Sequence, residues 1–361
     1  MSRARRRCRR LSSLLVAFVG VTAPALALAP PGLVGARLET TGDADPAATL
    51  ARLAPDPEPA WIGWSVPGVE ASRGLCCWAD DRYRGCSLAR RDPGWGSDDR
   101  DRRRGGTDLV VLLRAHRGRV DDVRQVGSAC PIDGAGERVV WLDRVDGSAA
   151  LALLDRLESA RDTDPDARER LLVAISHLAD PRAQELLERR ATDVALDREG
   201  RKNAIFWLGQ TRGEAGVAAL DRLLDREGDG ELREQALFSL SQTGSPRAVE
   251  RIERAAVEDR DPDVRSKAYF WLAQTDGAEI GAWISRRIAL EPDPEVREQA
   301  VFALSQLDDA ATWLVALLRS TSDRQLARQA LFWLGQTDDP RALEELARIL
   351  DAPRAGGSRR P

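Results

Sequence analysis

A short motif recurs five times in the second half of the chain, and this repetition constrains the fold more than any other feature. Each copy contains, in order, Phe, a variable residue, Leu, a small residue and Gln. The copies read IFWLGQT from 205, LFSLSQT from 237, YFWLAQT from 269, VFALSQL from 301 and LFWLGQT from 331. Their phenylalanines are spaced 32, 32, 32 and 30 residues apart. Self-similarity at this period predicts a solenoid, in which each unit buries its apolar face by stacking on its neighbours.

Each unit is expected to contain two helices. In the copy at 261–274, Asp261 is a helix-capping residue, Pro262 suits a first turn, and Val264 and Ala268 begin an apolar stripe. A second helical segment follows at 278–290. A weaker sixth copy has Val173 at the Phe position and His177 at the Gln position, and we expect His177 at the surface or in a turn. The prediction is a mainly α chain with a solenoid of about six helix pairs over residues 146–351.

An aspartate precedes each motif and is followed four residues later by arginine in most copies. With the central Ala, the Leu and the turn that follow, the Asp-Pro-x-Val-Arg pattern resembles HEAT repeats, in the short form typified by phycobilisome lyase subunits, over about residues 148–351. The resemblance implies that the Asp lies between the two helices and that successive Asp and Arg residues form a structural ladder. The matching residues are Asp229, Arg233, Asp261, Arg265, Asp293 and Arg297.

The same resemblance places the second helix of each pair on the inner, concave wall. At 100° per residue, each motif Phe and the residue before it should point away from the core stripe. Glutamine lies four residues after each Phe, and mostly amide residues lie three before it, so all three columns share one face. Side-chain amides both donate and accept hydrogen bonds, and the rings supply apolar contact, which suits an extended peptide. The candidate binding residues are Phe206, Phe238, Phe270, Phe302, Phe332, Gln210, Gln242, Gln274, Gln306 and Gln336.

Armadillo repeats are known for a ladder similar in kind, which binds extended peptides. With inner helices about 10 Å apart, five units span on the order of 40 Å, enough for roughly 12 extended residues. The alternative is that the Phe rings are packed between inner helices and that the Gln side chains bind carbonyls at the helix ends. The alternation of Trp207, Ser239, Trp271, Ala303 and Trp333 fits interdigitated layers, so these Trp are expected in the core.

The N-terminus has the pattern of a secretory leader. Six arginines precede a charge-free run from Leu11 to Leu28 that ends in small residues, so residues 1–29 are expected to be a signal peptide. A transmembrane anchor is the alternative.

Removal of the six Arg of this leader changes the formal net charge from -4 to -10. Nucleic acid is therefore disfavoured as a partner. No later segment approaches 18 apolar residues, so no membrane insertion is expected after cleavage. The expected location is periplasmic or extracellular.

Four cysteines, Cys76, Cys77, Cys86 and Cys130, follow the leader. An even number in an exported chain predicts two disulfides, and pairing of the adjacent Cys76 and Cys77 would be strained. A zinc site with His116 is the alternative. Residues 60–67 and 137–142 are strand-like, and 108–127 is typical of a hairpin around Arg117-Gly118.

These patterns predict a small β-rich domain at 59–145, after a linker at 30–58, and a disordered tail at 352–361. The domain either recognises a partner or caps the solenoid. Its segments at Trp61–Pro67, Cys76-Cys77-Trp78, Cys86 and 130–142 resemble exported bacterial HEAT-repeat proteins of unassigned function.

Catalytic motifs are missing from the sequence. The chain has two His, and no phosphate loop, HExxH or Gly-x-Ser-x-Gly motif. We expect a non-enzymatic scaffold that binds a protein or extended peptide, with no cofactor and no metal. The alternative is a lyase-like enzyme, because the resemblance extends to phycobilin lyases, which attach chromophores; an export signal argues against that cytoplasmic task.

Overall fold

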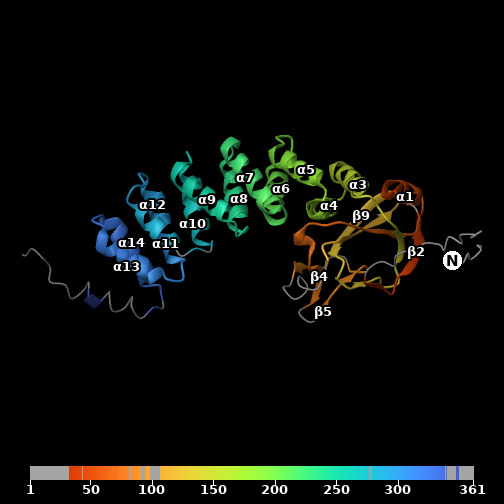
Figure 1. Cartoon of the computed structure of the whole chain (residues 1–361), viewed down its shortest axis with the longest axis horizontal. Helices are drawn as coiled ribbons and strands as arrows, with labels where there is room; N and C mark the ends of the chain where they lie inside the picture. The colour runs from red at the N-terminus through yellow and green to blue at the C-terminus, as the bar shows by residue number, and fades with distance from the viewer. Residues whose placement is uncertain are drawn as a thin grey trace, which may run out of the picture.

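A computed structural model describes residues 32–42, 44–80, 83–90, 94–97, 106–275, 277, 279–337, 339 and 347–348. The expected leader at 1–29, and the expected tail at 352–361, lie outside these residues. The described chain forms a β domain followed by six stacked helix pairs, and together they make an arch (Figure 1).

A five-stranded sheet is the centre of the β domain. Its strands are β2 (Arg37–Thr41), β3 (Ala60–Val66), β8 (Leu109–His116), β9 (Arg119–Gly127) and β11 (Arg138–Leu142), in the order β2-β11-β3-β8-β9. β11 pairs in parallel with β2 and β3, whereas β3, β8 and β9 are antiparallel. The predicted hairpin is confirmed, since Arg117 and Gly118 both adopt positive φ (51° and 77°), the conformation of a tight two-residue turn.

Two small sheets lie beside this central sheet. One contains β1 (Leu33–Val34), β10 (Ile132–Asp133) and β6 (Cys86–Ser87), and the other contains β5 (Tyr83–Arg84), β4 (Leu75–Asp80) and β7 (Gly94–Ser97). A helix, α1 (Pro46–Leu53), and a short 3-10 turn, η1 (Glu70–Ser72), complete the domain. The structure corrects the expectation of a linker at 30–58, because β2 is a strand of the central sheet and α1 begins with Asp45 as its cap. Short polar strands such as Arg-Leu-Glu-Thr-Thr carry little periodic signal.

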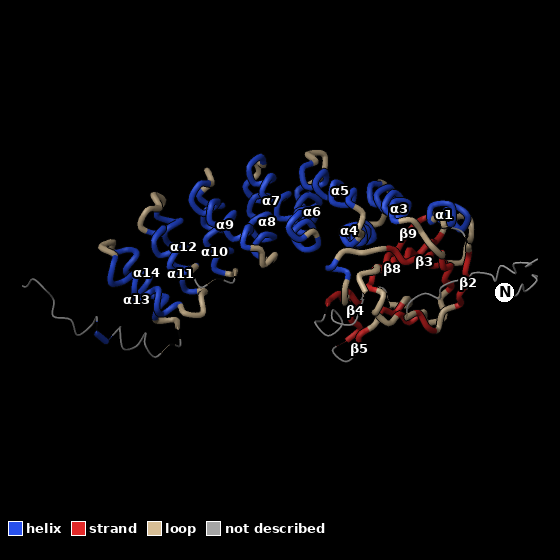
Figure 2. The backbone as a smooth tube through the Cα atoms, in the orientation of Figure 1, coloured by secondary structure: helices blue, strands red, loops and turns tan. Residues whose placement is uncertain are grey.

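The two faces of the central sheet are buried against different parts of the molecule. Ile62, Trp64 and Val111 belong to one core together with Leu154 and Leu171 of the first helix pair. The opposite face, which includes Trp61, Val110 and Leu112, packs with the four cysteines. Figure 2 shows the sheet beneath α3 and α4. The β domain therefore covers the apolar end of the solenoid.

The solenoid consists of an outer and an inner helix in each pair. The outer helices are α3 (Gly147–Ser159), α5 (Pro181–Thr192), α7 (Gly213–Arg226), α9 (Pro246–Glu258), α11 (Ile280–Ile288) and α13 (Ala310–Ser320). The inner helices are α4 (Pro165–His177), α6 (Arg198–Thr211), α8 (Gly230–Ser241), α10 (Pro262–Ala273), α12 (Pro294–Ser305) and α14 (Arg324–Leu334). Figure 1 shows α4, α6, α8 and α10 on the inner side of the arch. The predicted α-solenoid is confirmed.

Every inner helix begins after an aspartate whose side chain accepts a hydrogen bond from a backbone N–H of the first turn. These caps are Asp164, Asp197, Asp229, Asp261, Asp293 and Asp323. A side-chain cap satisfies N–H groups that have no partner within the helix. The recurring aspartate therefore sets where each inner helix starts.

The arginine ladder exists, but its main acceptors differ from those expected. Arg233 Nε donates to Asp259 at 2.9 Å, and Arg265 binds Glu291 at 2.9 Å, so each arginine reaches the carboxylate 26 residues ahead. That carboxylate lies two residues before the next cap, and Asp259 also accepts from the backbone N–H of Asp261 at 2.9 Å. The cap Asp261 is farther from Arg233, at 3.6 Å. An acidic residue recurs in the sequence at both positions, and the geometry of the loop places the earlier one against the arginine.

Candidate functional site

The five motif phenylalanines lie on the inner helices, partly exposed. Phe206, Phe238, Phe270 and Phe302 are half-buried, and the Phe332 side chain is 59% exposed. Their helices α6, α8, α10, α12 and α14 pack one against the next in sequence order. The rings are therefore neither fully exposed nor fully buried. This exposure is intermediate between the two arrangements considered from sequence, an exposed binding surface and rings packed between inner helices.

Four of the five residues that precede the phenylalanines do not share this exposure, whereas Leu331 on α14 is partly exposed. Ile205, Leu237, Tyr269 and Val301 are all buried, with at most 1% of each exposed. The expectation that these residues face the concavity is wrong. An inner helix contacts its own outer helix and both neighbouring inner helices, so its apolar stripe is wider than that of a helix packed on one side only.

The motif phenylalanines and the alternate tryptophans form one continuous series of ring contacts, which we call the aromatic column. Between helices, Phe206 stacks on Phe238 with centroids 6.1 Å apart, Phe238 meets Trp271 at 4.8 Å, and Phe302 meets Trp333 at 4.9 Å. Phe270 and Phe302 also stack at 6.1 Å. Within α6, α10 and α14, neighbouring Phe and Trp rings meet edge to face. The column contains Phe206, Trp207, Phe238, Phe270, Trp271, Phe302, Phe332 and Trp333.

The column repeats every two units, because large and small residues alternate at one position. Ser239 and Ala303 are fully buried where Trp207, Trp271 and Trp333 stand in the other units. These Trp are half-buried and pack against the core, so the expectation that they are core residues holds only for part of each ring. The remaining ring surface extends the apolar strip between the phenylalanines.

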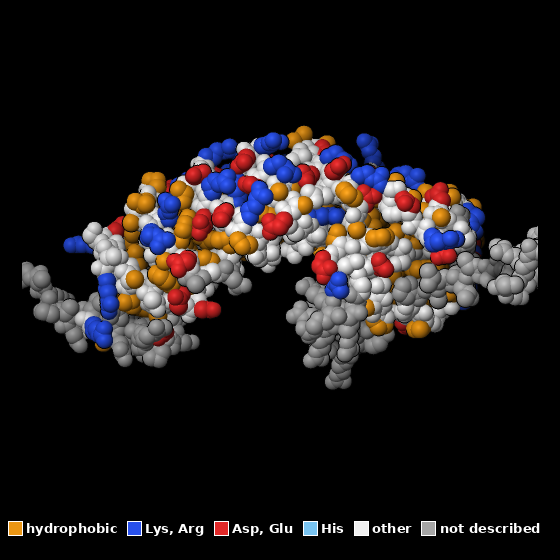
Figure 3. All heavy atoms as spheres, viewed as in Figure 1, with side chains coloured by type: hydrophobic (Ala, Val, Ile, Leu, Met, Phe, Trp, Pro, Cys, Tyr) orange, Lys and Arg blue, Asp and Glu red, His pale blue; other side chains and the backbone are white. Residues whose placement is uncertain are grey.

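Two grooves lie along the aromatic column. The first, which we call the Phe270 groove, has a volume of about 480 Å³ and is lined by Phe270, Phe302 and residues of α8, α10 and α12. The second, the Phe238 groove, has a volume of about 320 Å³ and is lined by Phe238 and Trp271. Figure 3 shows the hollow beneath the arch and hydrophobic and acidic side chains side by side over the middle of the solenoid.

Of the two columns of polar residues predicted beside the rings, one lines the grooves and the other does not. Gln235, Lys267 and Gln299, three residues before a Phe, line the grooves. The glutamines four residues after each Phe are exposed, and none lines either groove. Gln242, Gln274 and Gln306 are C-caps of their helices, and the amides of Gln242 and Gln306 donate to the preceding serine at 3.1 Å. The structure therefore brings only the earlier column together with the rings.

Charged residues of the groove walls are the part of the site that the sequence reasoning missed. Glu234 lies four residues before Phe238, and Glu234 and Lys267 line both grooves. Residues four apart share a helix face, so this position could have been found from spacing alone. Burial raises the pKa of the Glu234 carboxyl, and Lys267 opposes that effect.

His177 is buried, so its expected surface position is wrong. Its Nδ1–H donates to the carbonyl of Val173 at 2.9 Å, and its ring meets Trp207 edge to face at 5.6 Å. The backbone carbonyl of His177 accepts from the N–H of Val69 at 2.9 Å and from the hydroxyl of Ser72 at 3.0 Å. Burial lowers the pKa of His177 to about 4. Unlike the glutamines of the other units, this histidine stands at a helix end that meets the β domain.

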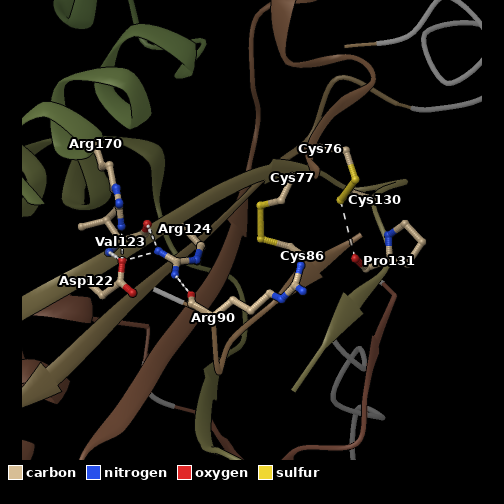
Figure 4. The surroundings of a disulfide bond; sticks show 10 residues. All are labelled: Cys76, Cys77, Cys86, Arg90, Asp122, Val123, Arg124, Cys130, Pro131 and Arg170. Atoms are coloured by element: carbon tan, nitrogen blue, oxygen red, sulfur yellow. Dashed lines mark hydrogen bonds and ion pairs between the residues drawn. A yellow bond between two sulfur atoms is a disulfide. The ribbon is translucent and has the colours of Figure 1, made fainter. Parts of the chain in front are cut away.

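Two disulfides close the β domain, Cys76–Cys130 and Cys77–Cys86 (Figure 4). As expected, the adjacent cysteines bond to different partners. All four thiols are used, so the alternative of a zinc site with His116 is wrong. The described residues contain no group of three or more His, Cys, Asp or Glu placed to hold a metal ion.

A buried charge cluster lies beside these disulfides. Arg124 is fully buried, binds Asp122, and donates to the carbonyl of Arg90. Arg170 of α4 reaches the same Asp122 carboxylate at 2.6 Å (Figure 4). The Arg124 guanidinium also lies 5.5 Å from the centroid of the Trp61 ring. The cluster joins the edge strand β9 to the first inner helix, which fixes the β domain on the solenoid.

The stacked pairs of helices, with capped inner helices and an arginine ladder, define an α-solenoid repeat protein. A family model described as HEAT repeats matches residues 194–273, 249–331 and 282–359. Residues 194–359 therefore carry HEAT repeats. No curated protein matches it. In the part of the chain that the structure describes, no helix has the length and apolar character needed to cross a membrane.

Several solved structures resemble the fold. Human deoxyhypusine hydroxylase in complex with glycerol is 17% identical and aligns over 57% of this chain and 91% of its own, with a TM-score of 0.25. The CpcE–CpcF complex of phycocyanin lyase from Nostoc is 22% identical over 56% and 81%, with a TM-score of 0.29. YibA from E. coli is 20% identical over 58% and 77%, with a TM-score of 0.34.

Proposed function

We propose that this chain is a non-enzymatic scaffold of the bacterial cell envelope that binds an extended polypeptide along the inner face of α6, α8, α10, α12 and α14. HEAT repeats are generally protein-binding scaffolds. The observation that carries the proposal is the aromatic column, whose half-exposed rings run without interruption through five inner helices. A row of partly exposed rings on a concave wall costs solvation free energy unless something covers it.

The walls of the grooves support a polypeptide as the occupant. Gln235 and Gln299 line the grooves beside the rings, and an amide can pair with both the N–H and the C=O of an extended backbone. Apolar side chains of the partner would contact the column between these amides. Peptides recognised in extended form obtain affinity from main-chain hydrogen bonds and specificity from side-chain pockets.

Export to the envelope is part of the proposal. Two disulfides persist in oxidising compartments and are rare in the cytosol, which agrees with the leader expected at residues 1–29. Fusion of residues 1–31 to a reporter that is active only outside the cytoplasm checks this point. An inactive, cytoplasmic fusion contradicts it.

The binding surface is tested with a pull-down from envelope extract. The bait is the purified chain, and the test variant is Phe270→Ser with Phe302→Ser. The matched control is Val257→Ser, because Val257 is an exposed apolar residue on the outer helix α9. We expect a stoichiometric partner with the unchanged chain and with the control, and loss of it with the double variant at a temperature where all three remain folded by circular dichroism. Equal recovery of the partner by the double variant contradicts the proposal.

A further inference from the structure

The Phe270 groove has an excess of negative charge. Its lining contains three carboxylates, Glu234, Asp263 and Glu295, and one ammonium group, Lys267, around the rings of Phe270 and Phe302. The neighbouring Phe238 groove is balanced, with Glu231 and Glu234 opposite Lys202 and Lys267. The acidic excess is therefore a property of one groove and not of the whole inner face.

Glu234 is a half-buried carboxylate without a bonding partner. No hydrogen bond or ion pair joins it to another described side chain. Glu231, three residues earlier on the same helix, accepts from Arg198 at 2.7 Å and from Lys202 at 2.9 Å. Burial, together with Asp263, Asp261 and Glu231, raises the pKa of Glu234, and only Lys267 opposes this effect. A cation placed in the groove would relieve this repulsion.

We propose that the Phe270 groove binds an arginine side chain of the extended partner, with the guanidinium between Glu234, Asp263 and Glu295 and its plane against Phe270 or Phe302. The inference rests on the proposed function, because it names the chemistry of the polypeptide that the inner face binds. The groove volume of about 480 Å³ lies within the range of specific ligand pockets, roughly 300–1,000 Å³.

Arginine fits this groove better than lysine for two physical reasons. A guanidinium presents several N–H donors in one plane, so it can bond to more than one carboxylate while its face lies on an aromatic ring. It is also more weakly hydrated than an ammonium group, so moving it into a partly buried groove costs less. A cation within about 6 Å of a ring centroid is attracted by the ring quadrupole.

The residues of the Phe238 groove predict which side chain of the partner lies beside the arginine. Lys202 is already paired with Glu231, so the Phe238 groove offers mainly the rings of Phe238 and Trp271. We expect an uncharged apolar side chain of the partner there. The recognised segment would therefore combine an arginine with a neighbouring apolar residue.

The experiment selects binders from a phage-displayed library of random 12-residue peptides on the purified full chain. Selected peptides are labelled with fluorescein and titrated by fluorescence anisotropy. We expect arginine to be enriched among them. Replacing that arginine with Gln should weaken binding by about tenfold or more, and replacing it with Lys should weaken binding less.

In each of two matched protein variants, three carboxylate residues are replaced by the corresponding amides. The test variant is Glu234→Gln, Asp263→Asn and Glu295→Gln, and the control is Glu185→Gln, Glu214→Gln and Glu250→Gln, three exposed residues of the outer helices α5, α7 and α9. Both remove three negative charges. The test variant should bind the arginine peptides about tenfold more weakly and with a smaller salt dependence, and the control should bind them as the unchanged chain does.

Two other outcomes overturn the inference and separate it from the proposed function. Peptides that lose binding with Phe270→Ser but show no enrichment of arginine, or bind the test and control variants equally, overturn the arginine site and leave the peptide-binding surface in place. Failure to recover any peptide that depends on Phe270 overturns both.

Discussion

The rings of Phe270 and Phe302, on successive inner helices, lie 3° from parallel with their centroids 6.1 Å apart. This offset stacking is repeated between Phe206 and Phe238, at 12° and 6.1 Å. Each pair of units thus shares one stacked pair, and a tryptophan links it to the next. The rings stabilise the contact between inner helices and at the same time remain partly exposed.

This double role predicts a graded loss of stability along the column. Phe302→Ala should lower the free energy of unfolding by about 1–3 kcal/mol, because the ring is half-buried and contacts both Phe270 and Trp333. Phe332→Ala should cost less than about 1 kcal/mol, because that ring is mostly exposed. Urea unfolding followed by circular dichroism measures both. Equal losses at the two positions would contradict the exposure described.

The buried ladder arginine should matter far more than an exposed one. Arg233→Ala removes the arginine partner of the nearly buried Asp259 carboxylate, and it removes one of the two arginine donors to the carbonyls of Glu227 and Gly228, the other being Arg260. We expect a loss of about 3–5 kcal/mol. Arg198→Ala breaks ion pairs to Asp229 and Glu231 at the surface and should cost about 0–1 kcal/mol. Chemical denaturation of both variants checks the difference, and comparable effects would argue against the burial of the ladder.

His177 predicts a pH dependence of stability. Burial lowers its pKa from 6.5 to about 4 in the folded chain, so below pH 6.5 the unfolded chain binds a proton that the folded chain excludes. The free energy of unfolding that the neutral imidazole contributes is therefore fully present above pH 6.5. It decreases by roughly 3 kcal/mol in total as the pH falls towards 4.

The matched variant is His177→Gln, since glutamine occupies the equivalent position in five other units. It should show a smaller loss of unfolding free energy between pH 7 and pH 4 than the unchanged chain, whatever its stability at pH 7. Denaturation at a series of pH values measures this slope. Identical slopes would mean that the imidazole titrates normally.

The two disulfides should contribute unequally. Cys76 and Cys130 are 54 residues apart in sequence, and Cys77 and Cys86 are 9 apart. In the chain-entropy model, closing the longer loop stabilises by about 4 kcal/mol and closing the shorter one by about 2.6 kcal/mol. Replacing each pair by serine and measuring thermal unfolding should therefore show the larger effect for Cys76 and Cys130.

The effect of those cysteine variants should also reach the solenoid. The central sheet shares its core with α3 and α4, so loosening the sheet exposes their apolar faces. Hydrogen exchange should accelerate in residues 147–177 before it does in α10 and α12. Unchanged exchange in α3 and α4 would contradict the role of the β domain as the cover of the first repeat.

Much of this architecture is readable from the chain itself. The recurring aspartate predicts where each inner helix begins, because its side chain binds N–H groups of the adjacent turn, and the apolar period predicts the paired helices. Arg117-Gly118 likewise predicts the hairpin. Each of these depends on interactions between residues close in sequence, so a local pattern records it.

Contacts between residues far apart in sequence needed the tertiary structure. Tyr269 is buried because an inner helix has three packed neighbours, and His177 is buried because the β domain covers it. The segment that carries β2 forms a strand only because β11, about a hundred residues later, provides its partner. By itself, the sequence determined the repeat, its caps and its paired helices, through local hydrogen bonds and periodicity. The stacking of units decided which column lines the grooves, since that depends on how each helix is rotated against its neighbours.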